Sequence, residues 1–334
     1  MSQNNDLAVL IIFFSRPETL KKVFEQVKKA KPAKLFLACD GARDGNKNDI
    51  ENIEKCKAIV EDIDWDCKVY KDYAETNMGC GMRPQTAIKN AFDHTEQLIV
   101  LEDDCVPHRD FFPYMAEMLE RYKNDTRIGL ISGFNHFLDW NCGNYSYFFT
   151  KVGPMAGAWA TWKRVWDDYD YDMSDMNSAL VRRLISDDIT SKRAKKKKLL
   201  LWENTIADIE SGKKLSCWDV QFGFLKYYKS YLTIVPKFSL ASNIGIGEGS
   251  THAVNAGNSM PSIFFAPEKD LGEIKHPPFI ICDHKYDTAV DNKYGFPNPI
   301  IRTLGRGKRF IKRVFKKLLS LIHISEPTRL GMIS

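Results

Sequence analysis

No two of the eight cysteines in this 334-residue sequence stand in a CxxC pair. This absence argues against a zinc site and against a redox dithiol. Cys39 and Cys105 lie in or beside apolar segments, where a free thiol behaves as a small apolar side chain. The cysteines therefore predict a protein of a reducing compartment.

Long hydrophobic runs are also missing, because none approaches the ~18 apolar residues that a membrane-spanning helix needs. The N-terminal segment MSQNNDLAVLIIFFSRPE contains an apolar run, but it lacks a basic region and a small-residue cleavage site. We therefore expect a first strand there rather than a signal peptide.

A large excess of one charge is absent as well. The net charge is +5, and the sequence is 44% hydrophobic and 27% charged, as is typical of a soluble globular protein. Much of the positive charge belongs to the C-terminal region, so the composition does not call for a nucleic-acid partner.

Strand-like and helix-like segments alternate through the first half of the chain. Strands are predicted at 7–14, 35–38, 67–70, 98–101 and 128–132, and helices at 49–63, 81–92, 111–122 and after Pro17. This order predicts an α/β fold with a mostly parallel sheet covered on both faces. After about residue 135 aromatic residues and turns dominate, which predicts a mixed α+β region.

Three consecutive carboxylates, Glu102-Asp103-Asp104, follow the apolar run Leu98–Leu101. Such close packing of acids is costly unless a cation joins them. Mg²⁺ and Mn²⁺ prefer carboxylate oxygens and bridge them to phosphates. Because open α/β sheets bind ligands at the carboxyl ends of their strands, the triplet predicts a metal and diphosphate site.

Other predicted strands also end in polar residues. Ser15 and Arg16 follow the first strand, and Asp40 follows the second. Arg16 could contact a base or a phosphate, or it could form a surface ion pair. Asp40 could accept a hydrogen bond from a base N–H group, or it could belong to a turn. Arg83 lies where a glycine-containing loop enters a helix, a position that favours a diphosphate or, alternatively, only a turn.

The second half offers further candidates. Asp219 follows Trp218 and is either a general base in an aromatic cleft or a helix N-cap. The glycine-rich segment 243–252 is typical of a lid, from which His252 would reach a metal or phosphate or would simply face solvent. Three tryptophans, Trp159, Trp162 and Trp218, suit either sugar stacking or the core.

The C-terminal region contains a basic amphipathic pattern over 306–322. Apolar residues fall on one helical face and Lys and Arg on the other, which predicts either contact with a membrane surface or docking on the protein body. Residues 323–334 continue neither pattern, and we interpret them as a non-native or disordered tail.

Together these stretches resemble the nucleotide-sugar-dependent glycosyltransferases of the GT-A fold. They are most similar to the inverting N-acetylglucosaminyltransferase I type and its bacterial, family 2-like relatives. The resemblance covers roughly residues 7–255. The matching stretches are Leu101-Glu102-Asp103-Asp104-Cys105-Val106-Pro107-His108-Arg109-Asp110-Phe111-Phe112, Ile131-Ser132-Gly133-Phe134-Asn135, Gly157-Ala158-Trp159, Trp218-Asp219 and Gly249-Ser250-Thr251-His252.

The resemblance implies a role for each matching residue. Asp104 would coordinate Mn²⁺ or Mg²⁺, Asp103 would contact the ribose, and Glu102 would support the site or touch the donor sugar. Arg16 and Asp40 match nucleotide contacts, Asp219 matches the general base, and Thr251 matches a hydroxyl that closes over the donor. One departure is that Val220 stands where the family often has a second acid.

The resemblance also implies an organisation and an activity. Residues 1–135 would form the nucleotide-sugar-binding half and 136–300 the acceptor-binding, catalytic half of one domain. The activity would be that of a metal-dependent inverting glycosyltransferase of the hexosyltransferase class, using a UDP-sugar and a glycan or glycolipid acceptor in cell-surface polysaccharide synthesis. A cytoplasmic protein is expected, with possible peripheral contact to the inner face of the plasma membrane through 306–322.

Two alternatives remain open at this point. A sugar-phosphate nucleotidylyltransferase shares the α/β core but normally has a glycine-rich basic loop after the first strand. Here that position reads Ser15-Arg16-Pro17-Glu18, without glycine. The other alternative is a non-enzymatic, membrane-associated binding protein built around 306–322.

Overall fold

The computed structural model describes residues 7–155, 157–189, 191–245 and 266–294. The chain divides into two compact units, Met1–Thr288 and Ala289–Ser334, and only a few residues of the second are described. The predictions for 306–322 and 323–334 concern segments outside the described residues. The account below is that of the first unit.

An eight-stranded sheet forms the centre of this unit, with the strand order β3-β2-β1-β4-β8-β6-β9-β7. Its strands are β1 (Ala8–Phe13), β2 (Lys34–Cys39), β3 (Lys68–Tyr73), β4 (Gln97–Glu102), β6 (Ile128–Ser132), β7 (Tyr147–Thr150), β8 (Ala158–Trp162) and β9 (Leu232–Pro236). The first four strands run parallel, as do β6 and β9, whereas β8 and β7 run antiparallel to their neighbours. The predicted α/β fold with a mostly parallel sheet is therefore confirmed.

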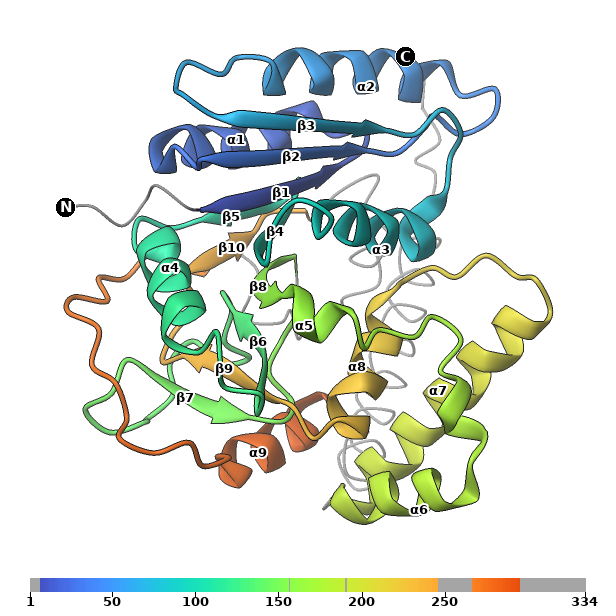
Figure 1. Cartoon of the computed structure of the whole chain (residues 1–334), viewed down its shortest axis with the longest axis vertical. Helices are drawn as coiled ribbons and strands as arrows, with labels where there is room; N and C mark the ends of the chain where they lie inside the picture. The colour runs from blue at the N-terminus through green and yellow to red at the C-terminus, as the bar shows by residue number, and fades with distance from the viewer. Residues whose placement is uncertain (1–6, 156, 190, 246–265, 295–334) are drawn as a thin grey trace, which may run out of the picture. The chain divides into compact units, whose positions relative to one another are not determined.

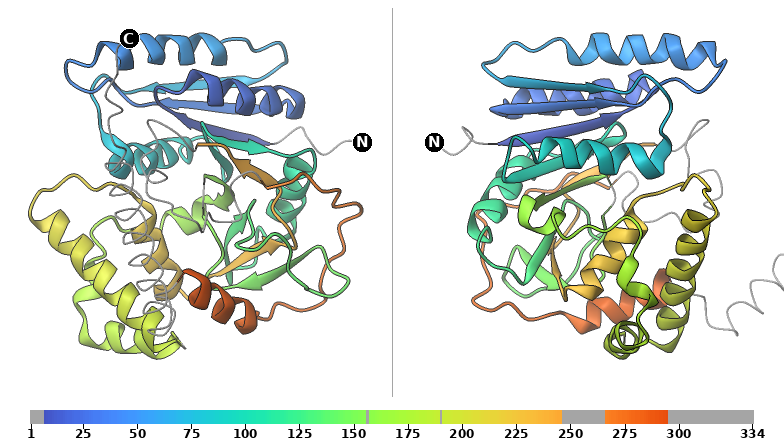
Figure 2. Two further views of the ribbon diagram at one scale, coloured as in Figure 1. Left: turned by 180° about the vertical axis from the view of Figure 1, so that it is seen from behind. Right: turned by 45° about the vertical axis from the view of Figure 1, so that its right-hand side comes forward.

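Helices flank the sheet, as Figures 1 and 2 show. They are α1 (Pro17–Ala30), α2 (Lys47–Val60), α3 (Gly79–Ala91), α4 (Phe111–Arg121), α5 (Lys163–Trp166), α6 (Ala179–Asp188), α7 (Lys192–Glu210), α8 (Asp219–Tyr228) and α9 (His284–Tyr294). Helix α1 illustrates why the pattern folds this way. Pro17 starts it without losing a needed N–H donor, and Leu20, Val23 and Val27 bury one face.

The chain reverses direction across the sheet between β1 and β4. It first builds β1, β2 and β3 outward in one direction and then returns to place β4 on the other side of β1. Such a reversal leaves a crevice at the carboxyl ends of the two central strands, where α/β proteins bind ligands. Ser15 and Arg16 follow β1, and the carboxylate triplet spans the end of β4, so both segments lie at this reversal.

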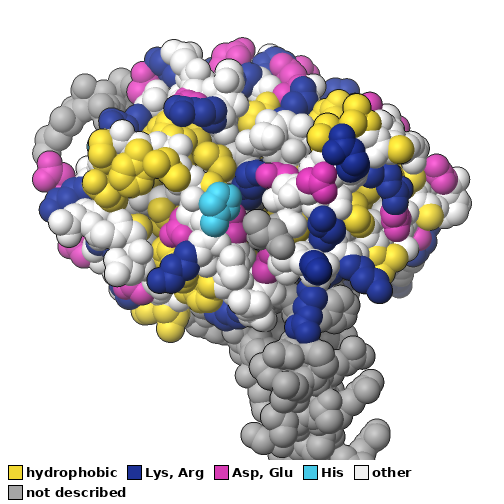
Figure 3. Space-filling model, turned by 90° about the horizontal axis from the view of Figure 1, so that it is seen from below, with side chains coloured by type: hydrophobic (Ala, Val, Ile, Leu, Met, Phe, Trp, Pro, Cys, Tyr) yellow, Lys and Arg dark blue, Asp and Glu magenta, His cyan; other side chains and the backbone are white. Residues whose placement is uncertain are grey.

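A smaller apolar cluster lies among the short 3-10 helix Ser174–Asn177 and α6, α7 and α8, and includes Met176, Ile185, Trp202 and Phe224. The basic stretch at 191–198 forms the first turns of α7, beginning with Ser191 as N-cap. Figure 3 shows Lys and Arg side chains interspersed with acidic and apolar ones on the face viewed from below. Within the described residues, no helix has the length and apolar character required to cross a membrane.

The three tryptophans that suited sugar stacking are core residues. Trp159, Trp162 and Trp218 are all at least nine-tenths buried, and Trp159 stacks on Trp218 with 5.5 Å between ring centroids. A buried ring has no free face for a ligand, so the sugar-stacking interpretation of these residues is wrong. Their spacing in the sequence does not distinguish a wall of a cleft from a core, because both require aromatic bulk.

Lys226 on α8 is a buried base, and its Nζ atom donates to the carbonyl of Gly153 at 3.3 Å. Burial and the charge of Lys198 together lower the pKa of Lys226 from 10.5 to about 7, and Asp287 opposes both. Between these two pH values the unfolded chain holds a proton that the folded protein has released, so stability should rise with pH.

We expect replacement of Lys226 by Met to remove this pH dependence. Urea unfolding between pH 7 and 10 should show wild type gaining stability relative to K226M by at most about 1.4 kcal/mol per pH unit. Lys213→Met is the matched control, because the Lys213 side chain is 64% exposed. Parallel pH profiles for wild type and K226M would contradict the assignment.

Candidate active site

Arg16 joins two of the three carboxylates. Its Nη1 atom donates to Asp104 Oδ2 at 2.7 Å, and its Nη2 atom donates to Asp103 Oδ1. The side chains of Asp103 and Asp104 are 2% and 9% exposed, whereas that of Arg16 is 33% exposed. The guanidinium therefore supplies the cation that the triplet requires, and one part of it faces outward.

The parallel pairing of β1 and β4 sets this geometry. Ile12 of β1 stands in register with Glu102 of β4, and the N–H of Asp103 donates to the carbonyl of Ile12 at 3.1 Å. The N–H of Phe14 returns a bond to Asp103 Oδ2 at 3.1 Å. Asp103 is thus fastened to the backbone of the neighbouring strand, which brings Arg16 over the triplet.

The electrostatics of the triplet reflect burial and mutual repulsion. Burial raises the pKa of Glu102, and the charges of Asp104 and Asp103 raise it further. Burial also raises the pKa of Asp103, although Arg16 opposes the shift. For Arg16, burial would lower the pKa, but the two aspartates outweigh it and hold the pKa above its ordinary value.

A two-stranded ribbon brings the start of the glycine-rich segment against Asp104. Strand β10 (Ala241–Asn243) pairs antiparallel with β5 (Cys105–Pro107), so Asn243 stands opposite Cys105. The N–H of Ile244 donates to the carbonyl of Asp104 at 2.8 Å. A Cβ atom on Gly245 would collide with Asp104 Oδ2, so only glycine permits this approach.

Sequence reasoning gave no individual role to two residues of this centre, Asn243 at the start of the glycine-rich segment and Gly157 in one of the matching stretches. Asn243 Nδ2 lies 3.4 Å from Asp104 Oδ1, and its own Oδ1 accepts the N–H of Gly245 at 2.8 Å. Gly157 has a φ of 75°, and a Cβ there would lie 2.6 Å from the sulfur of Cys105 and 3.0 Å from Glu102 Oε2. The Asn-x-Gly spacing at 243–245 was a signal for the first, but Gly157 depends on a strand that pairs from far along the chain.

Asp40 fixes the loop that leads into α3. Its carboxylate accepts the N–H groups of Gly41, Met78 and Gly79 at 2.8–2.9 Å, and Asn77 Nδ2 at 3.2 Å. Two of the N–H groups at this helix terminus, those of Met78 and Gly79, therefore already bind a carboxylate where a diphosphate was predicted. In this structure Asp40 has no spare oxygen to accept from a base, so the predicted base contact requires the loop to release it.

Arg83 points into the protein and not toward a ligand. Its side chain is 3% exposed, and the guanidinium bonds to the carboxylate of Asp72 at 3.0 Å, to the carbonyl of Asp72, and to the carbonyl of Cys39 at 3.1 Å. These bonds attach α3 to the ends of β2 and β3. The geometry gives Arg83 an anchoring role, and it does not favour the predicted diphosphate contact.

Asp219 is the first residue of α8, and Trp218 holds the N-cap position without a side-chain bond. The carboxylate is exposed, in contrast to the enclosed cleft that the sequence suggested, and the neighbouring thiol of Cys217 donates to it. Its negative charge adds to the burial and aspartate charges that raise the pKa of Glu102. Asp219 therefore acts electrostatically on Glu102.

Three predicted positions remain to be placed. Ser15 is half-buried in the turn between β1 and α1, next to Arg16. Thr251 and His252 lie outside the described residues, so their predicted contacts with donor and metal stay predictions. The described part of the chain nevertheless carries the segment as far as Gly245, directly beside Asp104.

The donor atoms at the triplet suit a hard divalent cation. All three side chains offer carboxylate oxygens, which Mn²⁺ and Mg²⁺ prefer. Among the described residues, Asp104 Oδ1 accepts the Cys105 thiol at 3.3 Å and lies 3.4 Å from Asn243 Nδ2, whereas Oδ2 is committed to Arg16. Asp104 therefore has one oxygen that remains suitable as a metal ligand.

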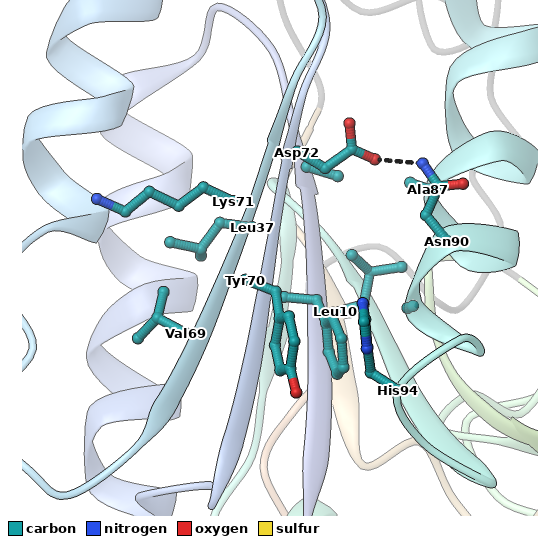
Figure 4. Close-up of a pocket in the computed structure, with 12 residues that line it drawn as sticks. Leu10, Leu37, Val69, Tyr70, Lys71, Asp72, Ala87, Asn90 and His94 are labelled. Atoms are coloured by element: carbon teal, nitrogen blue, oxygen red, sulfur yellow. Dashed lines mark hydrogen bonds between the residues drawn. The ribbon is translucent and has the colours of Figure 1, made fainter.

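A cavity of about 520 Å³ lies elsewhere, between α3 and the face of β1, β2 and β3. Figure 4 shows Leu10 and Tyr70 on the side of α3, and Asp72 bonded to Asn90. Tyr70 stacks against both His94, at 4.4 Å between centroids, and Phe36, at 4.6 Å. None of the residues proposed for the site lines this cavity, and we assign it no function.

No family model matches this sequence, and no curated protein is significantly similar to it. Among solved structures, the crystal structure of UDP-glucose pyrophosphorylase complexed with UDP-glucose is similar at 10% identity and a TM-score of 0.32. The match covers 70% of this chain and 91% of that chain. At these values it supports no inference about activity, and the α/β class follows from the sheet itself.

The Arg16 geometry predicts that R16M destabilises the protein by about 2–4 kcal/mol at pH 7, because two buried carboxylates lose their cation. The loss should shrink as pH falls from 7 to 5, since the Asp103 carboxylate of the variant, without the charge of Arg16 to oppose the rise in its pKa, takes up a proton at a higher pH than in the unfolded chain. Urea unfolding across this range checks the prediction. Arg127→Met, which removes a 61% exposed guanidinium, is the control. A loss of stability in R16M that does not vary with pH would contradict an electrostatic cause of that loss.

Proposed function

We propose that this protein is a metal-dependent inverting glycosyltransferase. The observation that carries the proposal is the convergence of Arg16, the acid triplet and Asn243–Gly245 at the reversal point between β1 and β4. Positive charge, hard oxygen ligands and a glycine-mediated close approach of the backbone are the features that a nucleoside diphosphate sugar requires. Uridine as the base rests on the resemblance of the sequence alone.

In this proposal Arg16 and a metal ion bound by Asp104 supply positive charge to the diphosphate. Asp104 would ligate Mn²⁺ or Mg²⁺ through the oxygen that Arg16 does not use, and the cation supplies positive charge to the leaving diphosphate. The Arg16 side chain is 33% exposed and would provide a permanent second charge. Asp103, fastened to the backbone of β1, holds Arg16 in this orientation.

Asp219 would act as the general base. In an inverting transfer a carboxylate removes the proton of the acceptor hydroxyl while that oxygen attacks the anomeric carbon from the face opposite the diphosphate. Asp219 is exposed, as an acceptor-facing base must be, and the start of α8 places it where its charge acts on Glu102. A glycan or glycolipid of the cell surface is the proposed acceptor class.

The donor can be identified by thermal shift with a panel of nucleotide sugars, each with and without Mn²⁺. A bound donor raises the melting temperature by mass action, so one selective, metal-dependent shift is expected. Release of pyrophosphate from a nucleoside triphosphate and a sugar phosphate would instead indicate a nucleotidylyltransferase. Equal shifts for all nucleotide sugars would contradict a specific donor site.

Asp104→Ala should abolish the metal-dependent donor shift and reduce transfer at least about 100-fold, because the proposed metal ligand is lost. Asp64→Ala is the matched control, since Asp64 is exposed and precedes β3. It therefore lies near the amino end of a parallel strand, whereas the triplet lies at the carboxyl end of β4. Donor titration in the thermal-shift assay and radiolabelled sugar transfer measure the two effects. A normal metal-dependent shift in D104A would remove Asp104 from the metal site.

Asp219→Asn should separate binding from chemistry. The amide cannot accept the hydroxyl proton, so transfer should fall about 10²–10⁴-fold while the donor-induced thermal shift stays unchanged. The metal requirement should also persist. Transfer by D219N at the wild-type rate would show that another group is the base.

A further inference from the structure

Three potential metal ligands gather where α9 begins, far along the chain from the acid triplet. The side chains are Cys282, His284 and Asp287, and their ligand atoms all lie within 4.8 Å of one another. The sulfur of Cys282 is 3.2 Å from Asp287 Oδ2, and His284 Nδ1 is 3.9 Å from the same oxygen. Asp287 Oδ2 is therefore the point that the other two donors share.

The backbone beneath these donors is fixed to the edge of the sheet. Cys282 forms a parallel bridge with Phe149 of β7, and the N–H of Asp283 donates to the carbonyl of Phe149 at 2.7 Å. The carboxylate of Asp283 accepts the indole N–H of Trp140 at 2.8 Å and the N–H of Tyr286 at 3.0 Å. Because Asp283 is held in this way, the residues on either side of it have little freedom to separate.

Neighbouring groups also orient the donors. The hydroxyl of Thr150 donates to Asp287 Oδ1, which leaves Oδ2 turned toward Cys282 and His284. Burial and the charge of Asp287 raise the pKa of the Cys282 thiol, which donates to Asp287 Oδ2, and the backbone N–H of Lys151, which donates to the sulfur, opposes this shift. Outer bonds of this kind fix the ligands of protein metal sites. Asp287 is buried, whereas the side chain of His284 is 68% exposed, so the cluster is open on one side.

We propose that Cys282, His284 and Asp287 form a zinc site that is separate from the proposed donor site. A thiolate, an imidazole and a carboxylate together suit Zn²⁺ and do not suit Mn²⁺ or Mg²⁺. Zinc–ligand bonds of about 2.0–2.3 Å in tetrahedral geometry separate the ligand atoms by roughly 3.3–3.5 Å. Of the three separations in the structure, the two to Asp287 Oδ2 are 3.2 and 3.9 Å, close to these values, and the one between Cys282 and His284 is at most 4.8 Å.

The charges and the remaining coordination position agree with this assignment. Binding replaces the thiol proton, so a thiolate and a carboxylate neutralise the divalent cation, and the proton passes to solvent. Three protein ligands leave a fourth position, which water fills through the open side at His284. Because zinc would tie the start of α9 to β7, its main effect should be on stability, and the inference does not depend on the proposed transferase activity.

Cobalt tests the ligand set directly. Full-length protein treated with a chelator and titrated with Co²⁺ should develop the near-ultraviolet band of thiolate-to-cobalt charge transfer, and Zn²⁺ should remove it. Cys282→Ser should lose the band, whereas Cys142→Ser, the matched control at another half-buried cysteine, should keep it. A wild-type spectrum without this band would overturn the proposal.

Zinc affinity provides a second, independent readout. His284→Ala alters an exposed side chain and should leave the fold intact, but it should weaken Zn²⁺ binding more than about 100-fold, beyond the usual cost of losing an outer contact. Zn²⁺ should raise the melting temperature of wild type and not that of H284A. Equal zinc affinity in wild type and H284A would also overturn the proposal, whatever the behaviour of C282S.

Discussion

The candidate site depends on one interaction, the contact of the Arg16 guanidinium with Asp103 and Asp104. Two buried carboxylates at neighbouring positions repel each other, and their burial adds a desolvation cost that only a cation can offset. Arg16 supplies that cation from the end of β1, so the adjacent parallel strands β1 and β4 are required for it. The same guanidinium defines which oxygen of Asp104 is committed and which is suitable for a metal.

The second half of the chain completes the centre through close backbone contacts. Gly157 reaches Glu102 and Cys105 from the antiparallel strand β8, and Gly245 reaches Asp104 from the β5–β10 ribbon. Any side chain at either glycine would displace the acids. The two approaches explain how residues more than 50 positions from the triplet can shape its surroundings without contributing a charged group.

The polar residues that the sequence singled out divide into two groups in the structure. Arg16 and the triplet converge as predicted from parallel strand ends, because β1 and β4 are neighbours. Asp40 and Arg83 also lie at strand ends or helix starts, but they bond to the protein itself, through the loop before α3 and through Asp72. A sequence shows that a carboxylate stands at a strand end; it does not show which N–H groups will already occupy its oxygens. The cluster at Cys282, His284 and Asp287 gave no sequence signal, since its spacing matches no familiar ligand pattern.

The sequence by itself determined the α/β class and the elements of the first half, because apolar periodicity and the placement of Pro17 are local properties that a buried strand or helix imposes directly. It also determined that an acid triplet would lie at the mouth of a buried strand. Only the tertiary structure decided the partners of those acids. Contacts between distant segments set the order of β4, β8 and β6, the burial of Trp159 and Trp218, and the approach of Gly245. The energies of these contacts depend on packing and charge in three dimensions, so they produce no periodic pattern in the sequence.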